Sequence, residues 1–157
     1  MSKIIITIPE FWTHSKKSAN KWQKLNNQGI YSGSMHRFTR AKIVKDLHEY
    51  ISLYMIPYKG LNLTRVKQIT YKLYTVINHG SISMRNGILC YKPATKSYIP
   101  TWDIENLATL WVKIGNDTLT LNNVISDDNV GILRNIAYEF IEIDELNKRK
   151  IEIIIDY

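Results

Sequence analysis

The chain switches several times between two-residue and helix-like periodicity, and this switching limits the folds that it can adopt. Residues 3–8 are rich in Ile and Thr and stop at Pro9, as expected of a strand. Residues 66–78 alternate in the same manner, whereas residues 37–55 space their apolar side chains as a helix does. The expected strands are 3–8, 66–78, 130–143 and 150–156, and the expected helices are 37–55 and 103–115. This order predicts an α/β (α+β) fold, a single small domain in which two main helices pack on a mixed sheet of about four strands.

Local signals predict the remaining boundaries. The dipeptide Asn86-Gly87 favours a turn, so residues 79–102 are expected to form a hairpin or an extended arm. Asp103 can cap a helix, and Gly115 is a typical C-terminal stop. Residues 14–34 are polar and lack a period, which predicts a basic loop with one short helix near 20–25. The domain 1–157 then has three parts: basic loops and a helix at 11–60, a long strand and basic arm at 64–102, and an acidic helix with strands at 103–157.

Basic and acidic residues are unevenly distributed along the chain. The first 102 residues hold 16 Lys and Arg against 3 Asp and Glu, whereas the last 55 hold 5 against 11. Such a division is typical of a protein that holds a polyanion on one surface, although a merely solvated basic face is the alternative. The expected DNA-binding residues are Lys16, Lys17, Lys21, Lys24, Arg37, Arg40, Lys42, Arg85, Lys92 and Lys96. Trp12, Trp22, Tyr31 and Tyr98 lie in the basic loops and could stack on splayed bases.

Composition excludes several classes of protein. No apolar run approaches the roughly 20 residues that a bilayer requires, and the N-terminus lacks the features of a secretory signal. Cys90 is the single cysteine, so an intrachain disulfide is impossible and a reducing compartment is expected. The four histidines have no partners at zinc-ligand spacing. These features predict a cytoplasmic protein.

Two acid pairs are the strongest chemical signal. Asp103 and Glu105 stand at the expected entrance of the second helix, and Asp127-Asp128 stands at the start of the expected adjoining strand. Mg²⁺ prefers oxygen ligands, and it would relieve the repulsion between crowded carboxylates. Asp103, Glu105 and Asp128 are therefore candidate metal ligands, with Asp127 as a further ligand or as a group that orients a metal-bound water.

The same acids have an ordinary structural interpretation. Asp103 could be only a helix cap, Glu105 an acid favoured by the helix dipole, and Asp127-Asp128 a turn. Moreover, residues two apart on a helix point in different directions, so Asp103 and Glu105 can face one pocket only where the backbone is still extended. Spacing alone leaves both interpretations open.

The chain contains three consecutive features: the run Asp103-Ile104-Glu105-Asn106-Leu107, an apolar helix, and Ser126-Asp127-Asp128. Together they resemble the signature of the RusA family of Holliday-junction resolvases. That family is commonly encoded by phages and prophages. The resemblance implies a homodimeric, Mg²⁺-dependent endodeoxyribonuclease, with Mn²⁺ as a substitute ion, that binds four-way DNA junctions and nicks two strands symmetrically. Asp103 and Glu105 would match the first two acids of the family, and Asp128 the third. The resemblance implies no small-molecule cofactor beyond the metal.

Two positions depart from the family pattern. Glu105 stands where the family usually has Asp, and Thr109 stands where it tends to have Lys. Lys113 follows Thr109 by one helical turn and is the candidate replacement that would stabilise the phosphate. A nucleic-acid-binding protein of the same fold with a weakened catalytic site is therefore the alternative.

Overall fold

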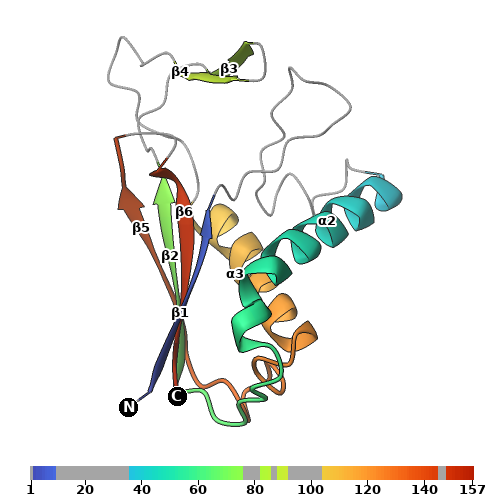
Figure 1. Ribbon diagram of the computed structural model, residues 1–157, viewed down its shortest axis with the longest axis vertical. Coiled ribbons are helices and arrows are strands. Elements are labelled where there is room, and N and C mark those ends of the chain that lie inside the picture. Colours follow the sequence, from blue (N-terminus) through green and yellow to red (C-terminus); the bar gives the residue numbers. More distant parts are fainter. Residues whose placement is uncertain (1, 10–35, 76–81, 86–87, 92–103, 145–147) are drawn as a thin grey trace.

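Four strands form one mixed sheet that carries the rest of the molecule. The computed structural model describes residues 2–9, 36–75, 82–85, 88–91, 104–144 and 148–157 (Figure 1). The sheet comprises β1 (Lys3–Pro9), β6 (Lys150–Asp156), β2 (Gln68–Thr75) and β5 (Ile136–Glu142), side by side in that order. β6 pairs antiparallel with β1 and β2, whereas β2 and β5 are parallel. The predicted mixed sheet of about four strands is confirmed.

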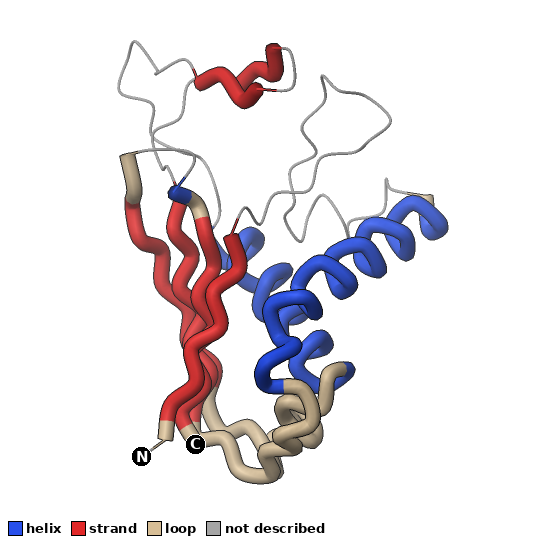
Figure 2. The backbone as a smooth tube through the Cα atoms, in the orientation of Figure 1, coloured by secondary structure: helices blue, strands red, loops and turns tan. Residues whose placement is uncertain are grey.

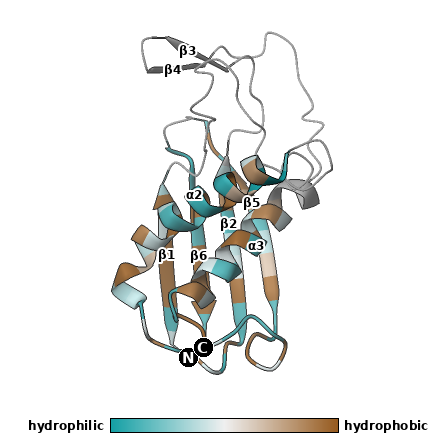
Figure 3. Ribbon diagram, turned by 90° about the vertical axis from the view of Figure 1, so that its right-hand side faces the viewer, coloured by the Kyte–Doolittle hydropathy of each residue, from teal (hydrophilic) through white to brown (hydrophobic). Residues whose placement is uncertain are grey.

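The two main helices cover one face of this sheet (Figures 1 and 2). They are α2 (Arg37–Met55), which contacts β1, and α3 (Ile104–Leu121), which contacts β2. Two-residue alternation directs one set of strand side chains towards them, and Figure 3 views the sheet from this covered side. The buried set comprises Ile4, Ile6, Ile8, Ile69, Tyr71, Leu73, Ile151, Ile153 and Ile155. Burial of these side chains accounts for the strand pattern in the sequence.

Helix α2 has the predicted bounds, but α3 does not end at Gly115. It continues for six residues to Leu121, because Gly115 has a packing role. A Cβ atom at Gly115 would lie 2.5 Å from Cε1 of Tyr71, so the glycine allows the helix to approach β2 closely.

The end of α3 is set instead by Asn123. Its φ of 51° is in the left-handed region, and its backbone N–H donates to the carbonyl of Thr120. The N–H of Val124 donates to the carbonyl of Leu119, five residues earlier. These two bonds form a Schellman motif, in which asparagine can take the position usually held by glycine.

The predicted strand at 130–143 begins later than expected. In β5 the ladder starts at Ile136, and before it only Leu133 forms an isolated bridge, with Val66. Asn129 accounts for the difference, because its carbonyl accepts hydrogen bonds from the N–H groups of Ile132 and Leu133 and so forms a turn. Asp127-Asp128 consequently lies in a loop rather than at the start of a strand.

The other predicted elements are found in part. β3 (Ile82–Arg85) and β4 (Ile88–Tyr91) pair antiparallel, which confirms the hairpin. The turn dipeptide at 86–87, the short helix expected near 20–25, and the four aromatic residues of the basic loops lie outside the described residues.

Candidate functional site

The entrance of α3 carries the first acid pair. Asp103 lies outside the described residues, and the helix begins at the next residue, Ile104. The backbone of Glu105 is therefore helical, although its side chain is not described. Asp103 and Glu105 were expected to share a pocket only if the backbone at both residues is extended. At Glu105 the backbone is helical instead.

Asp127 and Asp128 lie on the exposed loop that follows α3. The Asp127 carboxylate accepts hydrogen bonds from the backbone N–H of Asp128 at 2.7 Å and from Nδ2 of Asn129 at 2.6 Å. These bonds, first that from the Asp128 backbone, lower the pKa of Asp127 below its usual value. The Asn129 carboxamide in turn accepts from the N–H of Gly131 at 2.9 Å. Asp127 thus forms a turn, which was the alternative to a role as metal ligand. Its carboxylate remains ionised at neutral pH.

Helix α3 separates the two acid pairs. The backbone of Glu105 and the last residue, Leu121, differ by 16 positions, which corresponds to about 24 Å along the helix axis. Because β2, α3 and β5 form a crossover between parallel strands, α3 starts near the end of β2 and finishes near the start of β5. In Figure 2 the loop after α3 lies at the end of the sheet where the chain termini lie.

The Tyr71 hydroxyl, which contacts the second half of α3, is affected by the charge of Asp128. Burial raises the pKa of the Tyr71 hydroxyl, and the nearby charges of Asp117 and Asp128 raise it further. The same hydroxyl donates to Oδ1 of Asn116, which is 11 residues beyond Glu105 on α3. Asp128 is therefore close enough to Tyr71 for its charge to act on that hydroxyl. Among the described residues, no three potential metal ligands of the His, Cys, Asp and Glu types gather at one point.

Lys113 projects from the exposed side of α3. Its side chain is 57% exposed, and Nζ lies 3.5 Å from Oδ2 of Asp117, one turn further along the helix. An exposed pair of this kind contributes little to stability, so Lys113 could exchange Asp117 for a phosphate at small cost.

A partly buried polar contact between the two helices was missed by the sequence interpretation. Nδ1 of His48 lies 2.7 Å from Oγ1 of Thr118, and the Thr118 hydroxyl donates its hydrogen to the carbonyl of Ile114 at 2.6 Å. Since Thr118 has one hydroxyl hydrogen, the His48 contact requires an Nδ1–H donor. Burial lowers the pKa of His48; Asp117 opposes this effect and Lys113 adds to it. His48 is therefore a neutral donor that joins α2 to α3.

The predicted DNA-binding residues fall partly on α2. Arg37 and Lys42 are exposed, and Arg40 is partly buried and has a contact within the chain. Arg85 lies on β3, where only the backbone is described. The remaining six expected residues, Lys16, Lys17, Lys21, Lys24, Lys92 and Lys96, lie outside the described residues.

In the part of the chain that the structure describes, neither main helix combines the length and the apolar character that membrane crossing demands. No protein-family model and no curated protein matches this sequence.

Proposed function

We propose that the chain is a divalent-metal-dependent endodeoxyribonuclease that nicks Holliday junctions or other branched DNA. The observation that carries this proposal is the order of its acids. Asp103-Ile-Glu105-Asn106 lies at the start of the crossover helix and Asp127-Asp128 follows that helix, as in the family that the chain resembles. The mixed sheet with two helices is compatible with this resemblance. The proposed setting is DNA recombination or repair in the bacterial cytoplasm, as a phage or prophage product.

The basic half of the chain supports a nucleic-acid substrate. Helix α2 presents Arg37, Lys42 and Lys45 to solvent, and the first acid on this helix is Asp46. Contacts between such cations and phosphates release counterions, so the affinity should fall steeply with salt.

The proposal includes a homodimer whose two copies share each metal site. A shared site is supported by α3, which places about 24 Å of helix between Glu105 and Leu121, ahead of the loop that carries Asp128. Asp103 and Glu105 of one copy together with Asp128 of a second copy would hold Mg²⁺. A bound Mg²⁺ supplies charge neutralisation and an acidic water for phosphodiester hydrolysis. A two-fold dimer would also match the symmetry of a four-way junction.

A nicking assay tests this function directly. Wild-type protein should nick a four-way junction with Mg²⁺ and not with EDTA, and Asp128→Asn should lose about 100-fold or more in rate while it still binds. Glu49→Gln, which neutralises an exposed acid in the second half of α2, is the control and should retain activity. Wild-type protein that binds junctions without nicking them would exclude the nuclease.

Mixed dimers test the shared site. Asp128→Asn and Glu105→Gln should each be inactive alone. In a heterodimer, one composite site carries both substitutions and the other carries none, so a mixture should recover about a quarter of the wild-type sites. If each chain holds its own complete site, mixing recovers nothing.

The second candidate is a junction-binding protein of this fold without turnover. It is favoured by Glu105 and Thr109, the two departures from the family pattern, and by the partial engagement of Asp127 in its turn. Binding without nicking by the wild type, with Mg²⁺ or Mn²⁺ present, would establish it.

A further inference from the structure

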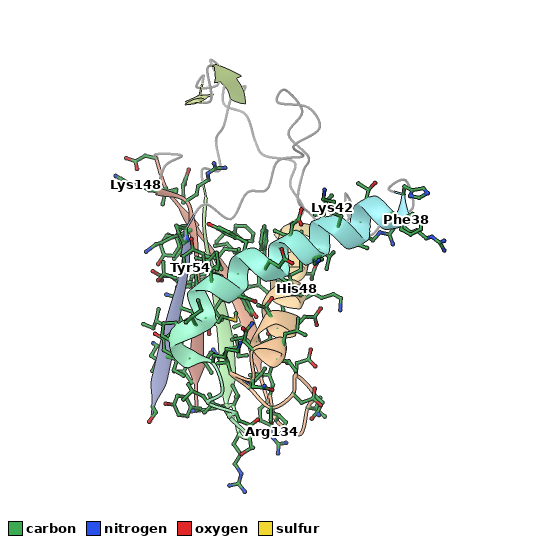
Figure 4. The ribbon with its side chains drawn as sticks, turned by 45° about the vertical axis from the view of Figure 1, so that its right-hand side comes forward. Phe38, Lys42, His48, Tyr54, Arg134 and Lys148 are labelled. Carbon is green, nitrogen blue, oxygen red and sulfur yellow. The ribbon has the colours of Figure 1, made fainter. Side chains whose placement is uncertain are left out.

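The first half of α2 contributes no fully buried side chain to the hydrophobic core. Leu47, Ile51 and Met55 are the buried residues of this helix, and all of them belong to its second half. Figure 4 shows Phe38 and Lys42 towards the far end of α2, away from Tyr54 and the sheet. We call residues 37–46 the outer half of α2.

Phe38 is the unusual residue of the outer half. Its side chain is 66% exposed, although a ring of this size is commonly buried. The ring of His36 lies 5.3 Å from the Phe38 ring between centroids, and the guanidinium of Arg37 lies 4.8 Å from the Phe38 centroid. Phe38 is therefore flanked by two flat polar groups and is open to solvent.

The charges around Phe38 indicate which kind of molecule could cover it. The outer half carries the cations Arg37, Arg40, Lys42 and Lys45, and its one acid, Asp46, is the last residue. A cationic surface with an exposed aromatic ring matches single-stranded or unstacked nucleic acid, because phosphates meet the cations and any base can stack on the ring.

A membrane surface fits this half of the helix less well. Ile43 and Val44 pack against the core, which leaves Phe38 as the one exposed large apolar residue of the outer half. Interfacial helices instead use a continuous apolar face.

We propose that the outer half of α2 binds the branch point of junction DNA, where Phe38 stacks on a base exposed by the crossing strands. Arg37 and Lys42 contact the flanking phosphates. This inference rests on the proposed function in taking branched DNA as the ligand. It adds a structural basis for branch selectivity, because linear duplex offers no unstacked base to Phe38.

Binding in EDTA tests the inference independently of cleavage. Phe38→Ala should weaken binding to a four-way junction about five- to a hundredfold and leave linear-duplex binding nearly unchanged. Leu53→Ala is the matched control, since Leu53 is a 60% exposed apolar residue at the other end of the same helix. It should change junction binding by less than about twofold.

A fluorescent base gives a second readout. 2-Aminopurine at the branch point should change in fluorescence when wild-type protein or the Leu53→Ala variant binds, and not when Phe38→Ala binds. Equal junction affinity and equal fluorescence for wild type and Phe38→Ala would overturn the inference while leaving the nuclease proposal intact. Wild-type protein that binds no junction would overturn both. Tighter binding to anionic vesicles than to junction DNA, lost in Phe38→Ala, would assign the surface to membranes and overturn the inference.

Discussion

Helices α2 and α3 are nearly equal in length, at 19 and 18 residues, but differ in how they use the core. From Ala108 onward α3 buries side chains on successive turns, and Trp111 is almost fully buried. In α2 burial begins only at Leu47. This comparison shows that α3 packs along most of its length, whereas the first half of α2 contacts the core through the partly buried Ile43 and Val44 and keeps Arg37, Phe38 and Lys42 exposed.

The largest expected effect is the difference in stability loss between replacing the buried Trp111 of α3 and replacing the exposed Phe38 of α2. Trp111→Ala should lower the free energy of unfolding by about 3–5 kcal/mol because it leaves a cavity in the core. Phe38→Ala should change it by less than about 0.5 kcal/mol. Urea denaturation measures both values. Similar losses for the two variants would mean that the outer half of α2 is packed after all.

Gly115→Ala should destabilise the protein by about 1–3 kcal/mol, because the added Cβ would overlap the Tyr71 ring. Helix propensity alone predicts the opposite sign, a gain of roughly 0.5–1 kcal/mol. Thermal and urea unfolding decide between these signs. Lys113→Ala, at an exposed position two residues away, is the control and should stay within about 0.5 kcal/mol of wild type.

Tyr71→Phe should cost about 1–3 kcal/mol, because Oδ1 of Asn116 would lose its donor in a buried position. Tyr74→Phe removes a similar hydroxyl from a more accessible bond with Glu152 and should cost less than about 0.5 kcal/mol. Chemical denaturation of the two variants compares them. Equal costs would indicate that water reaches the Tyr71 pair.

The smallest effect concerns the contact between the helices. Because the pKa of His48 is lowered in the folded state, the unfolded chain binds more protons near pH 6, and stability should fall as the pH drops below about 6.5. Asn at position 48 can keep a donor to Thr118 without titrating near neutral pH. His48→Asn should therefore reduce this fall, as measured by unfolding between pH 7.5 and 5. An unchanged profile would assign the dependence to other groups.

Sequence periodicity correctly predicted those helices and strands whose first and last residues are determined by neighbouring residues in the chain. The bounds of α2 and β6 agree with the structure because the periodicity of each is continuous and, in α2, ends before Pro57. The prediction failed at Gly115, since the residue that explains it, Tyr71, is 44 positions away in the chain. It failed again at 130–135, where the Asn129 turn delays the start of β5.

The sequence by itself determined the class of fold and which residues could do chemistry, because periodicity and acid spacing are properties of short segments. Only the tertiary structure decided how far apart those residues lie. The helical rise along α3 separates Glu105 from Leu121, and the fully buried residues of α2 all lie in its second half. Distance and burial depend on contacts between remote segments, which no local pattern encodes.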